Sequence, residues 1–334
     1  MSSSSSIWNE NPTVYLLIRR ILFIALTAGY PLVFYAILWK SPKSFGSLKW
    51  FLLFQLSSIT TQWVCGLLLI DLYTFVPSKI TRVNGVLMAW IDPRILYRAM
   101  YFVNSVASAS CLLLFWNRIF SILSMYQGPK SKLRLMFELV LYMITFLLST
   151  YIVIGLQIPE QSAVKKATKL VSPYYPDCLD EPNVVVLVVP YPEAMKKMTL
   201  FYVFYLFLMF LVTFLSAQIA YRLLSRRMQN QSERTKRMHR KFNRRTFLQV
   251  IIDTLFSSIP FSISNLATLF GWNLPELTYL VDVLSKNNPT ACIVVLFLYY
   301  EPYQKWLKAT FHRILCRVEN VSFITIVSIK SIEN

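Results

Sequence analysis

The sequence predicts an all-α membrane protein, a bundle of seven transmembrane helices. Composition is the first observation: of 334 residues, 55% are hydrophobic and only 15% are charged, whereas about 25% are charged in an ordinary soluble domain. The second is that the hydrophobic residues come in long blocks, because about 20 apolar residues are needed for a helix to cross the ~30 Å hydrocarbon core. Both observations exclude a disordered chain and a small disulfide-stapled secreted domain.

Seven stretches are long and apolar enough to span the bilayer, and the second, sixth and seventh carry the most polar residues. They are 21–39, 50–70, 99–116, 139–158, 198–221, 247–272 and 277–300. We therefore expect a short extracellular N-terminus (1–14), the bundle (15–300), a membrane-surface helix (301–316) and a cytosolic tail (317–334).

The distribution of Lys and Arg predicts the orientation of the bundle. The first, third and fifth loops and the tail carry 22 of these bases, and the second and fourth loops carry nine. Because cytosolic loops are enriched in Lys and Arg, the N-terminus is expected outside and the C-terminus in the cytosol. Arg19 and Arg20 lie on the poorly basic side and do not reverse the bias. The net charge of +18 thus follows from topology, and no nucleic-acid partner is expected.

Asp282 and Lys286 are the charged residues of the seventh stretch, and they are four residues apart on one helical face. Charged groups at membrane depth usually face the bundle interior or a wet cavity. Two interpretations stay open. The pair forms the polar floor of an outward-facing ligand cavity, with Lys286 contacting an anion, or it is a self-neutralised pair that fixes helix packing.

Proline is expected to bend the sixth stretch. Pro260 shares one face with Asp253, Ser257 and Ser264, and it removes a backbone hydrogen bond from the helix. Pro260 and Pro289 are therefore candidate switch positions. The bend is consistent either with a moving signalling element or with a static kink.

The cytosolic segments carry most of the bases. The fifth loop has ten between Arg222 and Arg245, which is consistent with contact to anionic lipid headgroups or an acidic partner and equally with a topology signal alone. After Pro302, bases alternate with apolar residues at helical spacing, which is typical of an amphipathic helix on the inner leaflet. Cys316 ends that helix and is a candidate for palmitoylation, or else a free thiol.

The sequence contains no pattern for catalysis or metal binding. Its five Cys form no CxxC, its two His (His239 and His312) are far apart, and nucleotide-binding and metalloprotease motifs are absent. We predict no enzyme activity, no cofactor and no metal.

Four short strings resemble the nematode serpentine chemoreceptors, most closely class H of the Str superfamily, with class I as a similar sister class. They are Asn117-Arg118 after the third stretch, Ile158-Pro159-Glu160-Gln161 after the fourth, Met238–Phe242 (MHRKF) before the sixth, and Glu301-Pro302-Tyr303-Gln304 after the seventh. The resemblance covers nearly the whole chain. It departs from the family pattern at Trp116, where an acid is usual, and at Gln304, where Arg is usual.

The resemblance implies a G-protein-coupled receptor in the plasma membrane, in the cilium of a sensory neuron. It would bind a small odorant-like molecule from outside and activate a heterotrimeric G protein. The implied coupling residues are Asn117, Arg118, Arg240, Lys241, Arg244 and Arg245, and the C-terminal motif is Pro302 and Tyr303. The alternatives are a seven-span ligand-gated channel, which would place the N-terminus in the cytosol, and a transporter, which would usually show an internal repeat.

Overall fold

The computed structural model describes most of residues 7–127, 158–188 and 251–310, and only scattered residues between 136 and 157 and between 189 and 250. Within these ranges helices occupy the first, second, third, sixth and seventh predicted stretches. The fourth and fifth stretches fall largely outside the described residues.

The first span is a broken helix, made of α1 (Thr13–Thr27) and α2 (Gly29–Lys40). The break at Ala28 is explained by Pro31, which has no N–H to donate to the carbonyl of Thr27. The second span is α3 (Leu48–Val64), which continues into a π-helical turn, η2 (Cys65–Leu69). Among the described residues, Thr13–Lys40 and Leu48–Leu69 are the helices long and apolar enough to cross a membrane by length and hydropathy.

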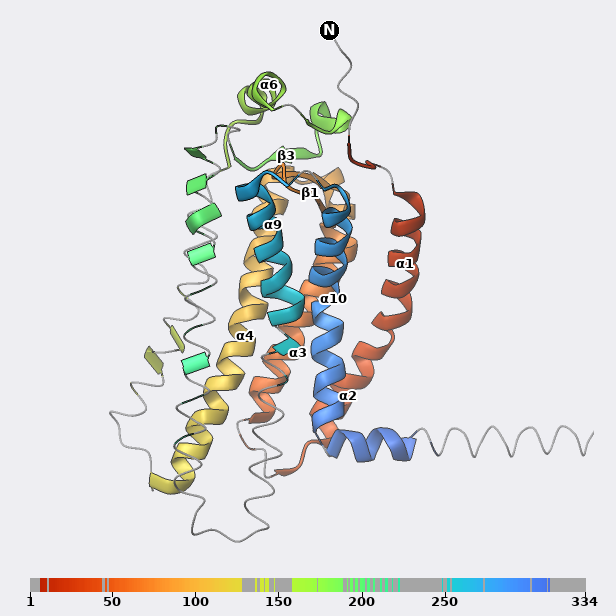
Figure 1. Ribbon diagram of the computed structural model, residues 1–334. Coiled ribbons are helices and arrows are strands. Elements are labelled where there is room, and N and C mark those ends of the chain that lie inside the picture. The colour runs from red at the N-terminus through yellow and green to blue at the C-terminus, as the bar shows by residue number, and fades with distance from the viewer. Residues whose placement is uncertain are drawn as a thin grey trace, which may run out of the picture.

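Of the remaining described spans, the third and the seventh pack against α3, and the sixth packs against the seventh. The long helix α4 (Pro93–Gln127) runs beside α3, and its small residues, such as Ala107 and Ser110, are buried and allow close approach. The sixth span contains a π-helical turn, η5 (Thr254–Ser258), and continues as α9 (Ile259–Phe270). The seventh is α10 (Glu276–Tyr299). Residues 302–310 form a further helix that turns across the end of the bundle (Figure 1).

A three-stranded antiparallel sheet, which the sequence did not predict, covers the other end of the bundle, near the N-terminus (Figure 1). The second loop supplies the hairpin β1 (Leu72–Phe75) and β2 (Ile80–Val83), and the fourth loop adds β3 (Val184–Val186) beside β2. Short helices accompany the sheet: η3 (Val86–Ala89), α6 (Gln161–Val171) and η4 (Asp177–Asp180). We call this the sheet end of the molecule and the opposite end the far end.

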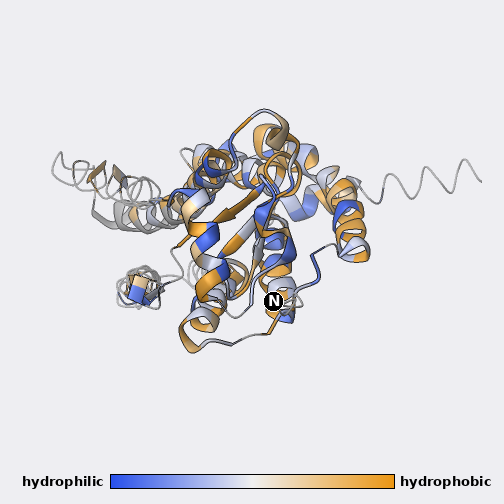
Figure 2. Cartoon of the chain, turned by 90° about the horizontal axis from the view of Figure 1, so that it is seen from above, coloured by the Kyte–Doolittle hydropathy of each residue, from blue (hydrophilic) through white to orange (hydrophobic). Residues whose placement is uncertain are grey.

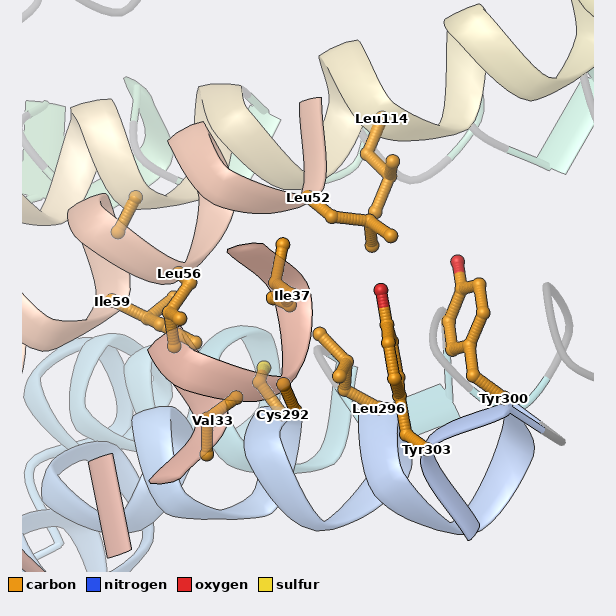
Figure 3. Close-up of a cluster of buried hydrophobic side chains, with 12 residues drawn as sticks. Val33, Ile37, Leu52, Leu56, Ile59, Leu114, Cys292, Leu296, Tyr300 and Tyr303 are labelled. Atoms are coloured by element: carbon orange, nitrogen blue, oxygen red, sulfur yellow. The ribbon is translucent and has the colours of Figure 1, made fainter. Parts of the chain in front are cut away.

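Hydrophobic side chains lie on the outside of the helices as well as between them, as expected where lipid is the solvent. Helix α1 has no buried residue, and Ile24 on it is 71% exposed. Seen from the sheet end, hydrophobic segments occur on both the outward and the inward sides of the ribbon (Figure 2). At the far end a buried cluster joins α2, α3, α4 and α10 to Tyr303 (Figure 3). This arrangement fits a bundle embedded in a bilayer.

Candidate functional site

Four charged side chains from three spans form a closed ring near the sheet end. Arg19 comes from α1, Asp71 follows η2, and Asp282 and Lys286 come from α10. Each base contacts both acids. The distances are 2.5 Å from Arg19 to Asp71, 3.0 Å from Arg19 to Asp282, 2.6 Å from Lys286 to Asp71 and 3.1 Å from Lys286 to Asp282. We call these four residues the charge ring.

The local backbone places Asp71 where the charge ring needs it. The π-helical turn η2 ends at Leu69, and the N–H groups of Ile70 and Asp71 both donate to the carbonyl of Cys65. Asp71 then takes a left-handed conformation, with φ of 41°, which Asp tolerates better than most residues. The chain thereby turns from the second span into β1 with the Asp71 carboxylate facing α1 and α10.

The charge ring is neutral and nearly closed to solvent. Two acids balance two bases, and their side chains are about one-tenth exposed. In a low-dielectric interior, ion pairs attract strongly, but each charge also loses its hydration, so a charge left without its partner is costly. The ring therefore ties α1, the end of the second span and α10 together, provided that all four members are present.

Aromatic side chains surround the charge ring on its sheet side. The hydroxyl of Tyr15 donates to Asp282, and the guanidinium of Arg19 lies 5.8 Å from the centre of the Tyr15 ring. Tyr15 packs edge-on against Tyr279 of α10, and Tyr279 in turn contacts Tyr73 of β1. Such rings attract a nearby cation through their π faces and remove water from the charges.

The N-terminal segment and the fourth loop close the sheet end. Trp8 donates through Nε1 to the carbonyl of Val76 at 3.0 Å. The carboxylate of Glu10 accepts from the backbone N–H groups of Asp177 and Cys178, at the start of η4. Burial raises the pKa of the Cys178 thiol to about 12, so the thiol stays protonated. The charge ring is thus covered by ordered chain on its sheet side.

The two candidate switch prolines lie in different helical settings. Pro260 is buried in the first turn of α9, directly after η5. A π-helical turn is a frequent response to a disturbed backbone hydrogen-bond ladder, so the predicted bend coincides with a real irregularity. Pro289 lies inside α10, three residues beyond Lys286. The polar face that the sequence predicts for the sixth span is described only in part. Ser264 is described, whereas Asp253 and the side chain of Ser257 lie outside the described residues.

At the far end, Tyr303 packs into the bundle core and does not point away from it. Its side chain is fully buried, and its hydroxyl is 2.8 Å from Oγ of Ser41, which follows α2. Pro302 is the first described residue of the terminal helix, and Asn117 is buried on α4. The remaining predicted coupling residues and the lipidation candidate lie outside what the structure describes; they are the side chain of Arg118, and Arg240, Lys241, Arg244, Arg245 and Cys316.

Sequence reasoning paired Asp282 with Lys286 but missed Arg19, Asp71 and Tyr15 as their partners. A signal was present, because Arg19 breaks the loop-charge rule and Asp71 closes the second apolar stretch. Because Arg19, Asp71 and the pair in the seventh stretch all lie near the same membrane boundary, their charges can be expected to pair with one another. The left-handed backbone turn at Asp71, which directs its carboxylate inward, could not be predicted from the sequence.

Comparison with known families places most of the chain in a single family model. The family model described as "Serpentine type 7TM GPCR chemoreceptor Srh" matches residues 10–313. A search of curated proteins finds no match. The matched range includes every member of the charge ring, the sheet and the helix that contains Tyr303.

Proposed function

The chain belongs to the Srh family of serpentine seven-transmembrane G-protein-coupled chemoreceptors, and from that premise we propose that it binds a small environmental molecule at the sheet end and activates a heterotrimeric G protein at the far end. The family match across residues 10–313 carries this proposal. The family is one of membrane chemoreceptors and not of enzymes.

The proposed topology places the sheet end outside the cell and the far end in the cytosol. Two observations support it: the bias of 22 bases against nine in the loops, and the position of the N-terminus and the terminal helix at opposite ends (Figure 1). Epitope tags at Ser2 and after Asn334 test it, by staining with and without permeabilisation. An exposed first tag and a hidden second tag are expected, and the reverse pattern would overturn the G-protein mechanism.

For ligand action we propose that a molecule entering among the outer helix ends changes the contacts of Asp282 and Lys286. Those two residues hold α10 to Arg19 of α1 and to Asp71. A ligand that binds better when these contacts are altered shifts the bundle between two packings. Motion of α10 and α9 would then reach the cytosolic surface near Arg118 and the fifth loop.

Ligand screening with a G-protein readout, in cells expressing the full chain, tests the activity. The Arg118→Ala variant is expected to keep surface expression and lose at least about tenfold in signalling. A ligand-gated current that persists when G proteins are inhibited would favour the channel alternative.

The paired variant Asp282→Asn/Lys286→Met separates a ligand role of the charge ring from a purely structural one. It removes one acid and one base together, so Arg19 and Asp71 remain a balanced pair at 2.5 Å. Unchanged surface expression with a ligand potency at least about tenfold lower supports contact with the ligand. Unchanged potency would leave the ring with a structural role only.

A further inference from the structure

The turn between β1 and β2, residues 76–79, fastens the sheet to the outer ends of two spans. Its Val76 N–H donates to Oγ1 of Thr278 on α10 at 3.1 Å. Its Pro77 carbonyl accepts from Oγ1 of Thr268 on α9 at 3.0 Å. The turn therefore makes a direct contact between the extracellular sheet and α9, the helix with the predicted switch proline.

Lys79 ends this turn, and its side chain is buried against α9. The residue is 6% exposed and has φ of 56°, a conformation that non-glycine residues rarely adopt. Its ammonium nitrogen lies 3.4 Å from the carbonyl oxygen of Ser264, 3.3 Å from the hydroxyl of Ser264 and 3.1 Å from Oδ1 of Asn265. Three N–H donors thus face three neutral oxygens.

No acid neutralises this ammonium among the residues that the structure describes. Helix α9 contains no ionisable residue, and neither does β3. The ionisable residues on the other elements around the turn make their own contacts or are exposed: Glu10, Tyr73, Arg82, Glu276, Tyr279, Asp282 and Lys286. A buried charge without a counter-ion is unfavourable, so the charged form of Lys79 is destabilised where it lies.

We propose that Lys79 and its oxygen site on α9 form a proton-sensing site, through which external pH controls how firmly the β1–β2 turn holds α9. Burial lowers the pKa of Lys79 to about 7, whereas an exposed lysine has a pKa of about 10.4. The seated turn binds the proton more weakly than the detached turn, so acidification favours detachment. Between pH 8 and pH 6 the ratio of detached to seated turns rises about tenfold.

Amide hydrogen exchange tests this with the full chain in lipid nanodiscs, without ligand or G protein. After correction for intrinsic pH dependence, amides of 259–270 are expected to lose about tenfold in protection from pH 8 to pH 6. The Lys79→Met variant is expected to show no such change. If wild-type protection stays flat, or if Lys79→Met keeps the wild-type profile, the proposal is overturned, whatever the receptor's signalling shows.

Control variants exclude other titrating groups. The double variant His239→Gln/His312→Gln and the variant Lys169→Met, at an exposed lysine paired with Asp180, are each expected to keep the wild-type profile. Loss of the pH dependence of protection in either control would overturn the assignment to Lys79.

A second variant, Asn265→Asp, decides the question should Lys79→Met fail to fold. Its new carboxylate raises the pKa of Lys79, so the protection of 259–270 should no longer change with pH below pH 8. An unaltered profile in Asn265→Asp would contradict the proposal.

Discussion

Both ends of the molecule have buried apolar clusters, but among the described residues the sheet end adds a network of buried ion pairs. At the sheet end, ion pairs and hydrogen bonds join segments distant in sequence, such as Arg19 and Asp282, which are 263 residues apart. At the far end, apolar side chains of α2, α3, α4 and α10 pack around Tyr303 (Figure 3). Polar contacts are directional and can exchange partners, whereas a close-packed core resists any change of volume. The proposed ligand and proton sites both lie among these polar contacts, where a partner can change without opening the far-end cluster.

The largest expected effect comes from leaving the charge ring unbalanced. Arg19→Leu leaves two acids and one base in a nearly dry site, and losing one partner of a buried pair costs about 3–5 kcal/mol. The unfolding temperature in detergent measures the loss. The matched control is Arg20→Leu, because Arg20 is exposed on the same helix and its removal should have little effect. The balanced double variant Asp282→Asn/Lys286→Met should be less destabilised than Arg19→Leu, and the reverse order would contradict the closed ring.

At the far end, volume should matter more than hydrogen bonding. Tyr303→Ala removes a fully buried ring and is expected to cost about 3–5 kcal/mol. Tyr303→Phe keeps the ring and loses the hydroxyl contact with Ser41, which is worth about 1 kcal/mol. Thermal unfolding of the two variants side by side checks this. Equal losses would show that the hydroxyl contact dominates, and that the contrast between the ends is wrong.

The junction of the second span with the sheet should tolerate no side chain at Gly85. A Cβ there would lie 2.2 Å from the carbonyl oxygen of Leu69, so backbone would have to move. We expect Gly85→Ala to cost about 1–3 kcal/mol, measured as reduced thermal stability. Gly29→Ala is the control, because no atom lies within 4 Å of a Cβ at Gly29. A Gly85→Ala loss no larger than that of Gly29→Ala would mean that the junction is looser than described.

The smallest effect is expected where the N-terminal segment meets the fourth loop. Glu10→Gln keeps an acceptor for the N–H groups of Asp177 and Cys178 but removes its charge, so about 1 kcal/mol or less should be lost. Faster hydrogen exchange at 177–180, without a change at the far end, is the expected observation. A change at both ends would show that the ends are coupled in the resting state.

The spans were predictable because membrane insertion needs long apolar stretches, and the class H resemblance is confirmed by the family match. The contact between Asp282 and Lys286 also followed from helical spacing, and the structure confirms that contact at 3.1 Å. The sheet was not predictable. Its strands are three or four residues long, and Val184–Val186 pairs with β2 only because the folded bundle brings the two loops together. The roles of Arg118, of the fifth loop and of Cys316 stay predictions.

The charge ring also sets an order of events during synthesis. Arg19 and Asp71 emerge early and can pair as soon as the second span is inserted, but Asp282 and Lys286 arrive only with the last span. Until then the early pair lacks its covering partners, and the first span lacks its ties to α10. A chain truncated before the seventh span therefore exposes an incomplete polar junction to the lipid, a feature by which the quality-control machinery of the membrane could distinguish it from a finished receptor.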